Sequence, residues 1–340
     1  MSGSSPGQDA FEERLRLKIE AYHEAALVYA AVKLGLPDRL ADGPETGEQL
    51  AQALQLSAPH LTRVLRGLCS IGICEELADG SFALAAGGRS LCAFSPSRLA
   101  EKVQIVVGQY WQPWANLVAN LETGKPAFEQ VFGMSVSDWR GLNPEKGALF
   151  DSYLAKETLA QAGAILEALD LAHVNIVADI GGGYGGLLAA LLGAHPHIEG
   201  ILFDRPRTLA AAEPFLQSLG VAERVECVAG DFLAEIPVRA DLYLLKGVLQ
   251  QWDDQAARTI LGNCRSAMPE GAKLAIIELL LPERANDDPA AIMLDLHMMT
   301  ITGGRARSLA QFKELLSEAG LALAKVTPTR SGLAIIAARR

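Results

Sequence analysis

The chain lacks long apolar runs, although half of its 340 residues are hydrophobic. No stretch approaches the roughly 20 consecutive apolar residues that cross a bilayer. The opening segment, MSGSSPGQDAFEERLRLK, has no apolar core of the kind found in secretory signal peptides. We therefore expect a soluble cytoplasmic protein that does not contact a membrane.

Cysteine is scarce as well. The five cysteines show neither CxxC spacing nor a companion cluster of histidines. This pattern indicates buried free thiols rather than disulfides or a metal centre. Asp and His residues with metal-ligand spacing are also missing, so we expect no bound metal. The cysteines are Cys69, Cys74, Cys92, Cys227 and Cys264.

Positive charge is in deficit, because 30 Lys and Arg residues oppose 40 Asp and Glu residues, for a net charge of −10. A nucleic-acid surface requires concentrated basic side chains, which this balance disfavours. Small molecules are therefore the expected partners. The length is sufficient for two domains, each with a core of its own.

Residues 1–100 show the pattern of a winged helix. A long helical stretch is predicted to end at Gly35 and Pro37. Two shorter helices and a hairpin with its turn at Asp79-Gly80 follow. The helices are predicted over 11–34, 46–54 and 57–71, and the hairpin over 73–85.

A winged helix raises the hypothesis of a DNA-binding regulator, with the 57–71 helix in the major groove. That helix contains only Arg63 and Arg66 as basic residues, and the hairpin contains Glu75 and Glu76, which repel phosphate. We therefore expect no nucleic-acid binding. The apolar faces of the long first helix and of this module indicate a dimerisation domain instead.

Residues 101–170 are predicted to be a helical linker with a loop over 124–132. Aromatic side chains gather here, in a chain that is only 6% aromatic. Such residues usually form a core, but some of them can wall a ligand pocket. They are Tyr110, Trp111, Trp114, Phe128, Phe132 and Trp139.

Over 171–340, buried-strand patterns alternate with helical segments. This alternation is typical of an α/β domain with a doubly wound parallel sheet, which here ends in a strand pair. The predicted strands lie at 176–180, 200–203, 225–229, 242–246, 273–279, 321–327 and 333–338.

The first of these strands runs directly into the glycine-rich loop DIGGGYGG over 179–186. Glycine allows a tight turn and lets a ligand lie against backbone N–H groups. Gly181, Gly183 and Gly186 match the GxGxxG fingerprint of dinucleotide-binding proteins. The loop alone is therefore compatible with both NAD and S-adenosylmethionine.

Three further features favour S-adenosylmethionine. Asp179 precedes the glycines, as in the acidic-x-Gly-x-Gly-x-Gly loop of methyltransferases. Asp204 ends the next strand, where a carboxylate can accept both hydroxyls of a ribose. Asp231-Phe232 follows the third strand after a glycine. Together they predict a Rossmann-like domain that binds S-adenosylmethionine.

These motifs resemble those of the plant caffeate and bacterial antibiotic type of O-methyltransferase, a family of class I S-adenosylmethionine-dependent enzymes. The similarity extends over nearly the whole chain, from the winged helix onward. The matching segments are GKPAF at 124–128, residues 150–158, the glycine loop, GDF at 230–232, YLLKGVL at 243–249, WDD at 252–254, NCR at 263–265 and GGR at 303–305.

The resemblance implies a homodimer with intertwined N-terminal domains and S-adenosylmethionine as the cofactor. It places Trp252 near the adenine, and Thr158 where the family often has a serine that contacts the cofactor. The residues expected to bind the cofactor are Asp179, Gly181, Gly183, Asp204, Asp231, Phe232, Lys246, Trp252 and Thr158.

The chain departs from the family where the acceptor is expected. O-methylating members have a general-base histidine after a Val-Leu pair, whereas this sequence has Gln250 and Gln251. A second family carboxylate is replaced by Ala306, and the carboxylate after the fifth strand is retained as Glu278. Gln250 is therefore predicted to position an acceptor rather than to remove its proton.

The missing base restricts the acceptor atom. A phenol must lose its proton to attack a sulfonium methyl efficiently, and a positioned base contributes roughly 10² to 10⁴ in rate. A thioether or ring nitrogen needs no base, so alignment and desolvation suffice. We expect an S- or N-methyltransferase. Family members methylate a phenazine nitrogen or the thioether of 4-methylthio-2-hydroxybutyrate, in dimethylsulfoniopropionate synthesis, and the thioether is the preferred expectation.

Two alternatives stay open. O-methylation would be retained if His297 replaced the missing base. Some members of this fold also bind S-adenosylmethionine without transferring its methyl group. Arg305 and Arg307 are expected to be solvated. The predicted acceptor pocket contains Tyr110, Trp111, Trp114, Met293 and Met298.

Overall fold

The computed structural model describes residues 6–340, with side chains from Asp9 onward, so the expectation about the opening segment falls partly outside the described residues. The chain forms two compact units that divide between Trp111 and Gln112. One hydrophobic core lies in the first unit and two larger ones lie in the second. Within the described residues, no helix has both the length and the apolar character of a membrane span.

The first unit begins with α1 (Pro6–Lys33), after which Gly35 adopts a left-handed φ of 68°. The predicted long helix is confirmed. Pro37, expected only to stop this helix, lies instead in the first turn of α2 (Leu36–Asp42). Proline is tolerated there because the N–H groups of a first turn have no intrahelical acceptor.

Two further helices and a three-stranded antiparallel sheet complete the core of this unit. The sheet contains the predicted hairpin, in which Gly80 adopts a φ of 80°. Leu50, Leu65 and Phe82 are buried in the core. The elements are β1 (Glu45–Thr46), α3 (Gly47–Leu54), α4 (Ala58–Ser70), β2 (Cys74–Glu76) and β3 (Ser81–Leu84), with the strand order β1-β3-β2.

Short helices follow, and one of them corrects a prediction. The expected loop over 124–132 is present at 124–126 but wrong for the rest, because α8 (Ala127–Phe132) forms there. Phe128 is buried against Phe132 and Trp139, with ring centroids 4.6 and 5.7 Å away, so packing stabilises this short helix. The other elements are α5 (Leu99–Ile105), a π-helical turn (Val106–Tyr110), α6 (Trp111–Ala115), α7 (Leu117–Thr123), α9 (Val136–Leu142) and α10 (Pro144–Leu166).

A seven-stranded sheet forms the centre of the second unit, in the order β6-β5-β4-β7-β8-β10-β9. The first five strands in this order, β6, β5, β4, β7 and β8, are parallel to one another. Strand β10 pairs antiparallel with both β8 and β9. Each predicted strand is confirmed to within one residue at either end. The bounds are β4 (Ile176–Ile180), β5 (Glu199–Asp204), β6 (Val225–Ala229), β7 (Leu242–Lys246), β8 (Lys273–Glu278), β9 (Ala322–Pro328) and β10 (Ala334–Arg339).

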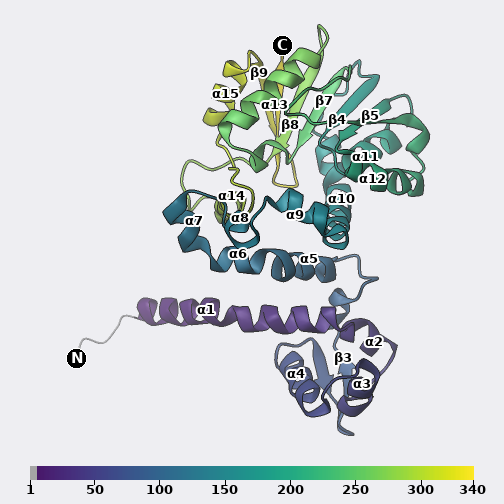
Figure 1. The fold of residues 1–340 in the computed structure, drawn as a ribbon, viewed down its shortest axis with the longest axis vertical. Helices are drawn as coiled ribbons and strands as arrows, with labels where there is room; N and C mark the ends of the chain where they lie inside the picture. The colour runs from purple at the N-terminus through teal and green to yellow at the C-terminus, as the bar shows by residue number, and fades with distance from the viewer. Residues whose placement is uncertain (1–5) are drawn as a thin grey trace. The chain divides into compact units, whose positions relative to one another are not determined.

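Helices cover both faces of this sheet (Figure 1). Ile260 and Phe312 of α13 and α15 belong to one core, whereas Leu188 and Leu216 of α11 and α12 belong to the other. Because the parallel strands all end at the same edge, residues at their carboxyl ends come together. The helices are α11 (Gly186–Ala194), α12 (Pro206–Ser218), α13 (Asp254–Ala267), α14 (Pro289–Ile301) and α15 (Leu309–Glu318).

All five cysteines are free thiols. Burial raises the pKa of Cys74 and of Cys264 to about 12. Cys227, expected to be buried, is exposed on the edge strand β6. In the described part of the chain, no group of three or more His, Cys, Asp and Glu residues is placed to hold a metal ion.

Candidate active site

Four charged side chains lie at the carboxyl ends of four neighbouring parallel strands. Asp179 is the last residue but one of β4, and Asp204, Lys246 and Glu278 are the last residues of β5, β7 and β8. A parallel sheet binds ligands at this edge. The sequence analysis predicted Asp179, Asp204 and Lys246 as cofactor ligands and Glu278 as a residue of the acceptor side, and these roles stay predictions.

The glycine loop needs its glycines for backbone conformation and for space. Gly181 and Gly183 adopt left-handed φ angles of 69° and 62°. A Cβ on Gly182 would lie 2.5 Å from the Asp179 carboxylate, whereas a Cβ on Gly183 would meet no atom within 4 Å. The loop is therefore tightly packed on its sheet side and open at Gly183, where a ligand can approach the backbone.

Asp204 holds the open part of this loop. Its Oδ2 accepts from Gly183 N at 2.9 Å, and its Oδ1 accepts from Arg205 N at 2.7 Å. Burial raises the pKa of Asp204, and these two hydrogen bonds oppose the shift. The Thr208 side chain also donates a hydrogen bond to Asp204. A carboxylate offers about four acceptor positions, so Asp204 retains acceptor capacity for a ligand hydroxyl.

Asp179 is buried beside the loop, and the half-buried Lys246 is near enough to influence its charge. Burial raises the pKa of Asp179 to about 7, against the effect of the Lys246 charge. Its Oδ1 is buried without a hydrogen-bond partner among the described residues. Lys246 Nζ donates to Thr158 Oγ1 at 3.1 Å, which gives Thr158 a contact with the predicted cofactor residues. Burial lowers the pKa of Lys246, and Asp179 and Glu157 oppose this.

An aromatic pair lies on the other side of the loop. The Phe232 and Trp252 rings meet edge to face, with centroids 5.8 Å apart. A Cβ on Gly181 would lie 3.2 Å from the Phe232 ring. Asp231, by contrast, is exposed. Its Oδ1 accepts from Leu233 N at 2.9 Å, so this carboxylate stabilises the backbone turn at 231–233.

These features fit S-adenosylmethionine. The remaining acceptor capacity of Asp204 suits a ribose hydroxyl, and the half-buried rings of Phe232 and Trp252 suit a purine. The unpartnered Oδ1 of Asp179 is an acceptor for a hydrogen-bond donor of a ligand, because a buried polar atom is costly to leave unpaired. The space at Gly183 admits a ligand against the backbone.

Trp114 and His297 come together from distant parts of the sequence. Trp114 Nε1 donates to His297 Nδ1 at 3.1 Å, and the two rings stack at 20°. Burial, with a contribution from the Arg140 charge, lowers the pKa of His297 to about 4. The imidazole is therefore neutral at physiological pH. Because Nδ1 accepts a hydrogen bond, its one proton lies on Nε2.

Gln250 and Glu278 are joined through the backbone. Gln250 N donates to Glu278 Oε1 at 3.0 Å, while Oε2 is buried without a partner among the described residues. Burial raises the pKa of Glu278 to about 7, against the Gln250 hydrogen bond and the Arg307 charge. In the part of the chain that the structure describes, the Gln250 side-chain amide has no hydrogen-bond partner.

The remaining predicted pocket residues belong to both units. Met298 is buried and Met293 is 53% exposed, both on α14. Tyr110 and Trp111 belong to the first unit, where Tyr110 is buried and the Trp111 ring meets the edge of Tyr22 at 6.3 Å. Their assignment to an acceptor pocket stays a prediction.

Two charged residues near this site were not predicted. Arg140 on α9 is buried, with its guanidinium 3.3 Å from the centroid of the Phe150 ring. Asp151 on α10 lies 3.9 Å from Arg207, and burial raises its pKa to about 6. Charged residues in helical segments are usually solvated, so their sequence pattern contained no signal for burial.

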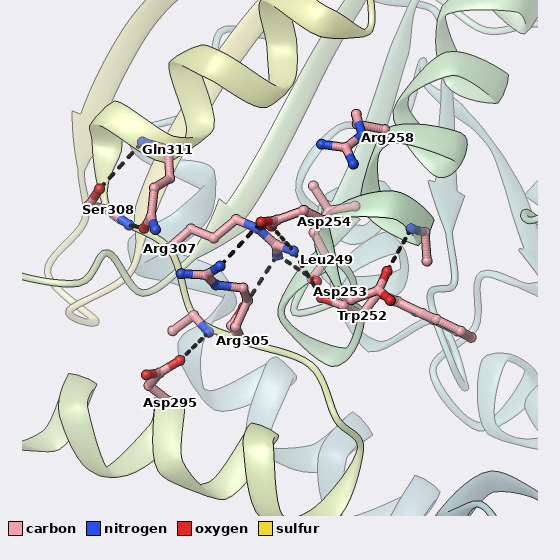
Figure 2. A network of polar contacts seen from close by, with 12 residues as sticks. Leu249, Trp252, Asp253, Asp254, Arg258, Asp295, Arg305, Arg307, Ser308 and Gln311 are labelled. Atoms are coloured by element: carbon pink, nitrogen blue, oxygen red, sulfur yellow. Dashed lines mark hydrogen bonds and ion pairs between the residues drawn. The ribbon is translucent and has the colours of Figure 1, made fainter. Parts of the chain in front are cut away.

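The arginines beside the Gly-Gly loop differ from each other. Arg305 is exposed, as expected, but Arg307 is completely buried, so the expectation of a solvated side chain is wrong for Arg307. Arg307 is buried because its guanidinium donates hydrogen bonds to backbone carbonyls inside the protein, chiefly Leu249 O and Trp252 O (Figure 2). Ala306, which replaces a family carboxylate, is buried and donates from its backbone to Asp295 Oδ1 at 2.8 Å.

Two domain families match the chain. The O-methyltransferase domain matches residues 114–322, and the O-methyltransferase dimerisation domain matches residues 18–92. Phenazine O-methyltransferase PhzM of Lysobacter antibioticus is 39% identical over 322 residues, which cover 94% of each chain. The 8-amino-8-demethylriboflavin N,N-dimethyltransferase of Streptomyces davaonensis is 33% identical over 320 residues, 93% of this chain and 91% of that protein.

Solved structures agree with these relatives. The crystal structure of LaPhzM superposes with a TM-score of 0.91 and 38% identity, covering 97% of this chain and 99% of the other. The crystal structure of an O-methyltransferase from neocarzinostatin biosynthesis, in complex with S-adenosylmethionine and 2-hydroxy-5-methyl naphthoic acid, has a TM-score of 0.82 and 30% identity. The match covers 93% of this chain and 95% of the other. The chain therefore belongs to the O-methyltransferase family and is an S-adenosylmethionine-dependent methyltransferase of small molecules.

Proposed function

We propose that this enzyme methylates a nitrogen atom of a small aromatic acceptor without a general base. The observation that supports this most directly is the hydrogen bond from Trp114 to His297 Nδ1. It leaves the proton of a neutral imidazole on Nε2, so His297 can donate a hydrogen bond but has no lone pair on that nitrogen for a proton. The alternative of His297 as a relocated base is therefore disfavoured.

The other groups at the acceptor side support the same conclusion. Gln250 is an amide and does not take up a proton near neutral pH. Glu278 Oε1 is occupied by the Gln250 N–H, and Oε2 is shielded from solvent. In our proposal Glu278 fixes the backbone at Gln250, and Gln250 and His297 orient the acceptor through hydrogen bonds.

S-adenosylmethionine supplies an electrophilic methyl group on a sulfonium. On the protein side, Asp204, the Gly183 backbone, Asp179 and the Phe232–Trp252 pair would hold it, and Lys246 keeps Thr158 in place at 3.1 Å. A neutral nitrogen needs only alignment with the methyl and exclusion of water to react. The positive charge that it gains is tolerated by neighbouring aromatic faces such as Trp114.

The acceptors for which the relatives are named favour nitrogen and oxygen over sulfur. The two described above are named for an oxygen of a phenazine and for an amino nitrogen of a flavin, both on flat ring systems. Nitrogen is the one of these two atoms that needs no base. A thioether such as 4-methylthio-2-hydroxybutyrate is chemically compatible with the same residues, and we place it second because neither relative is named for a sulfur acceptor.

We also propose that the enzyme works as a homodimer. A dimerisation domain family matches residues 18–92. Large apolar side chains on α1 are exposed within the described chain, and a second copy would cover them. They are Phe11, Leu15, Leu17, Ile19 and Tyr22. Sedimentation analysis should give the mass of a dimer, and a monomer at micromolar concentration would contradict this part of the proposal.

The test of the acceptor atom uses methyl-labelled S-adenosylmethionine and acceptors that share one aromatic scaffold, with an amine, a ring nitrogen or a phenol. The thioether 4-methylthio-2-hydroxybutyrate completes the set. Mass spectrometry should place the label on nitrogen, with one S-adenosylhomocysteine formed for each methyl group transferred. Label on sulfur or phenolic oxygen would overturn the proposed atom. Turnover without S-adenosylhomocysteine would identify non-methylating chemistry instead.

A variant sharpens the test. Gln250→His places an imidazole where O-methylating family members have their base, beside a Glu278 carboxylate whose Oε2 lacks a partner. This variant should gain activity on the phenol, by up to the 10² to 10⁴ that a positioned base contributes. Gln250→Asn, which introduces no base, is the matched control and should gain none.

A further inference from the structure

Arg307 is the largest of the fully buried side chains in the described chain. Burying a guanidinium removes its hydration, which is costly unless hydrogen bonds and an opposite charge replace the water. Here Asp254 Oδ1 accepts from both Nε and Nη2 of Arg307 at 2.9 Å. One carboxylate neutralises the charge, but it leaves several N–H groups to be satisfied elsewhere.

Those N–H groups point at the backbone of the loop that contains Gln250 and Trp252 (Figure 2). Arg307 Nη1 donates to Leu249 O at 2.8 Å, and Nη2 donates to Trp252 O at 2.9 Å. The two carbonyls lie on either side of Gln250. A single planar group thus holds both ends of the segment that presents Gln250 on one side and the cofactor residue Trp252 on the other.

The backbone around Arg307 is itself fixed at several points. Leu281 N donates to Arg307 O at 3.0 Å, and this hydrogen bond links the backbone of Arg307 to the segment just after β8. Ala306 N donates to Asp295 Oδ1, on the helix that contains His297. A Cβ on Gly304 would lie 2.3 Å from Gln250 O, so the two backbones are in direct contact. The 303–307 segment therefore connects the loop, the end of β8 and α14.

We propose that Arg307 is a positioning residue that holds the 249–254 loop in the conformation required for methyl transfer, by binding Leu249 O, Trp252 O and Asp254 together. It acts on the acceptor through Gln250 and on the cofactor through Trp252. The inference rests on the proposed function in two respects, the placement of Gln250 at the acceptor and of Trp252 at the cofactor. It does not depend on which acceptor atom is methylated.

Arginine is required for this role because of its shape. Its fork offers five N–H donors in one plane, whereas a lysine has a single ammonium group that cannot reach both carbonyls and the carboxylate with the same geometry. Arg307→Lys therefore keeps the charge and loses the simultaneous hydrogen bonds. Arg305→Gln is the matched control, because Arg305 binds the same Asp254 at 3.2 Å from the exposed side.

The experiment measures kcat per cofactor-binding site, with sites counted by calorimetric titration with S-adenosylhomocysteine. This normalisation removes any loss that comes only from unfolded protein. Arg307→Lys should lower kcat per site by roughly 10²-fold, the scale of an error of about 1 Å in alignment, and should weaken S-adenosylhomocysteine binding several-fold. Arg305→Gln should stay within about twofold, as expected for an exposed ion pair.

Gly304→Ala provides a second perturbation, because its Cβ pushes on the same loop while Arg307 stays intact. It should reproduce the loss of kcat per site, and it keeps the inference testable if Arg307→Lys does not fold. Unchanged kcat per site, within about threefold, in the folded variants would overturn the inference. An equal loss in Arg305→Gln would also overturn it, because the shared carboxylate would then be responsible. A product methylated on oxygen would refute the proposed acceptor atom and leave these comparisons unaffected.

Discussion

The role of His297 gives the sharpest prediction. Replacing it with glutamine removes the imidazole but keeps an N–H donor at a similar distance from the backbone. If His297 only donates a hydrogen bond, His297→Gln should lower kcat on the acceptor that the enzyme methylates by about tenfold at most, the value of one neutral hydrogen bond of about 0.5–1.5 kcal/mol. If it were the base, the loss would be roughly 10² to 10⁴.

The structure provides a reason to expect the smaller effect. Burial lowers the pKa of His297 to about 4. Transfer of a proton to this imidazole from a phenol, whose pKa is near 10, is uphill by about six units, or roughly 8 kcal/mol. The hydrogen bond from Trp114 adds to this cost, because the imidazole must first move its proton to Nδ1 or break that contact.

The assay is single-turnover methyl transfer with saturating S-adenosylmethionine, measured between pH 5 and 9 for the wild type, His297→Gln and His297→Ala. No inflection from His297 is expected in this range, since its pKa lies below it. A loss of 10²-fold or more in both variants, with a wild-type rate that rises through a pKa of about 6 to 7, would refute the reasoning and identify His297 as the base.

Three further predictions address other groups. Asp204→Ala should weaken S-adenosylmethionine binding by roughly 1 to 3 kcal/mol, or about 5- to 150-fold in Kd by calorimetry, through lost hydrogen bonds to the ribose; an unchanged Kd would contradict the assignment. Gln250→Ala should lower activity less than about 10²-fold, and a loss near 10⁴ would show that it takes part in proton transfer. Because burial raises the pKa of Glu278 from its ordinary 4.5 to about 7, its contribution to stability is present below pH 4.5 and is lost as the pH rises through 7. Urea unfolding should therefore show the wild type losing up to roughly 3 kcal/mol relative to Glu278→Gln between pH 4.5 and 8; parallel curves would exclude a buried ionisable Glu278.

Some parts of the site were predictable because they depend on neighbours in the chain. Left-handed φ angles at Gly181 and Gly183 exclude most side chains, so the glycine pattern indicates the loop directly. Asp204 and Lys246 are the last residues of short buried strands, and a parallel sheet brings such strand ends to one edge. The order of motifs along the chain was therefore enough to indicate the cofactor site.

Other parts were not predictable in this way. The hydrogen bond between Trp114 and His297 joins residues 183 positions apart, and it determines where the proton of the imidazole lies. Nothing in the neighbourhood of Arg307 distinguishes it from Arg305, yet one is buried and the other is exposed. The difference comes from two carbonyls of a loop more than 50 residues earlier in the chain, Leu249 O and Trp252 O.

The sequence alone thus determined the α/β sheet, the glycine loop and the absence of a histidine at position 250. These properties follow from short-range periodicity, from backbone sterics and from the identity of single residues. Only the tertiary structure decided the helix at 127–132, the protonation state of His297 and the burial of Arg307. Each depends on which distant groups pack together, and packing sets the hydration and the hydrogen-bond partners that control burial and protonation.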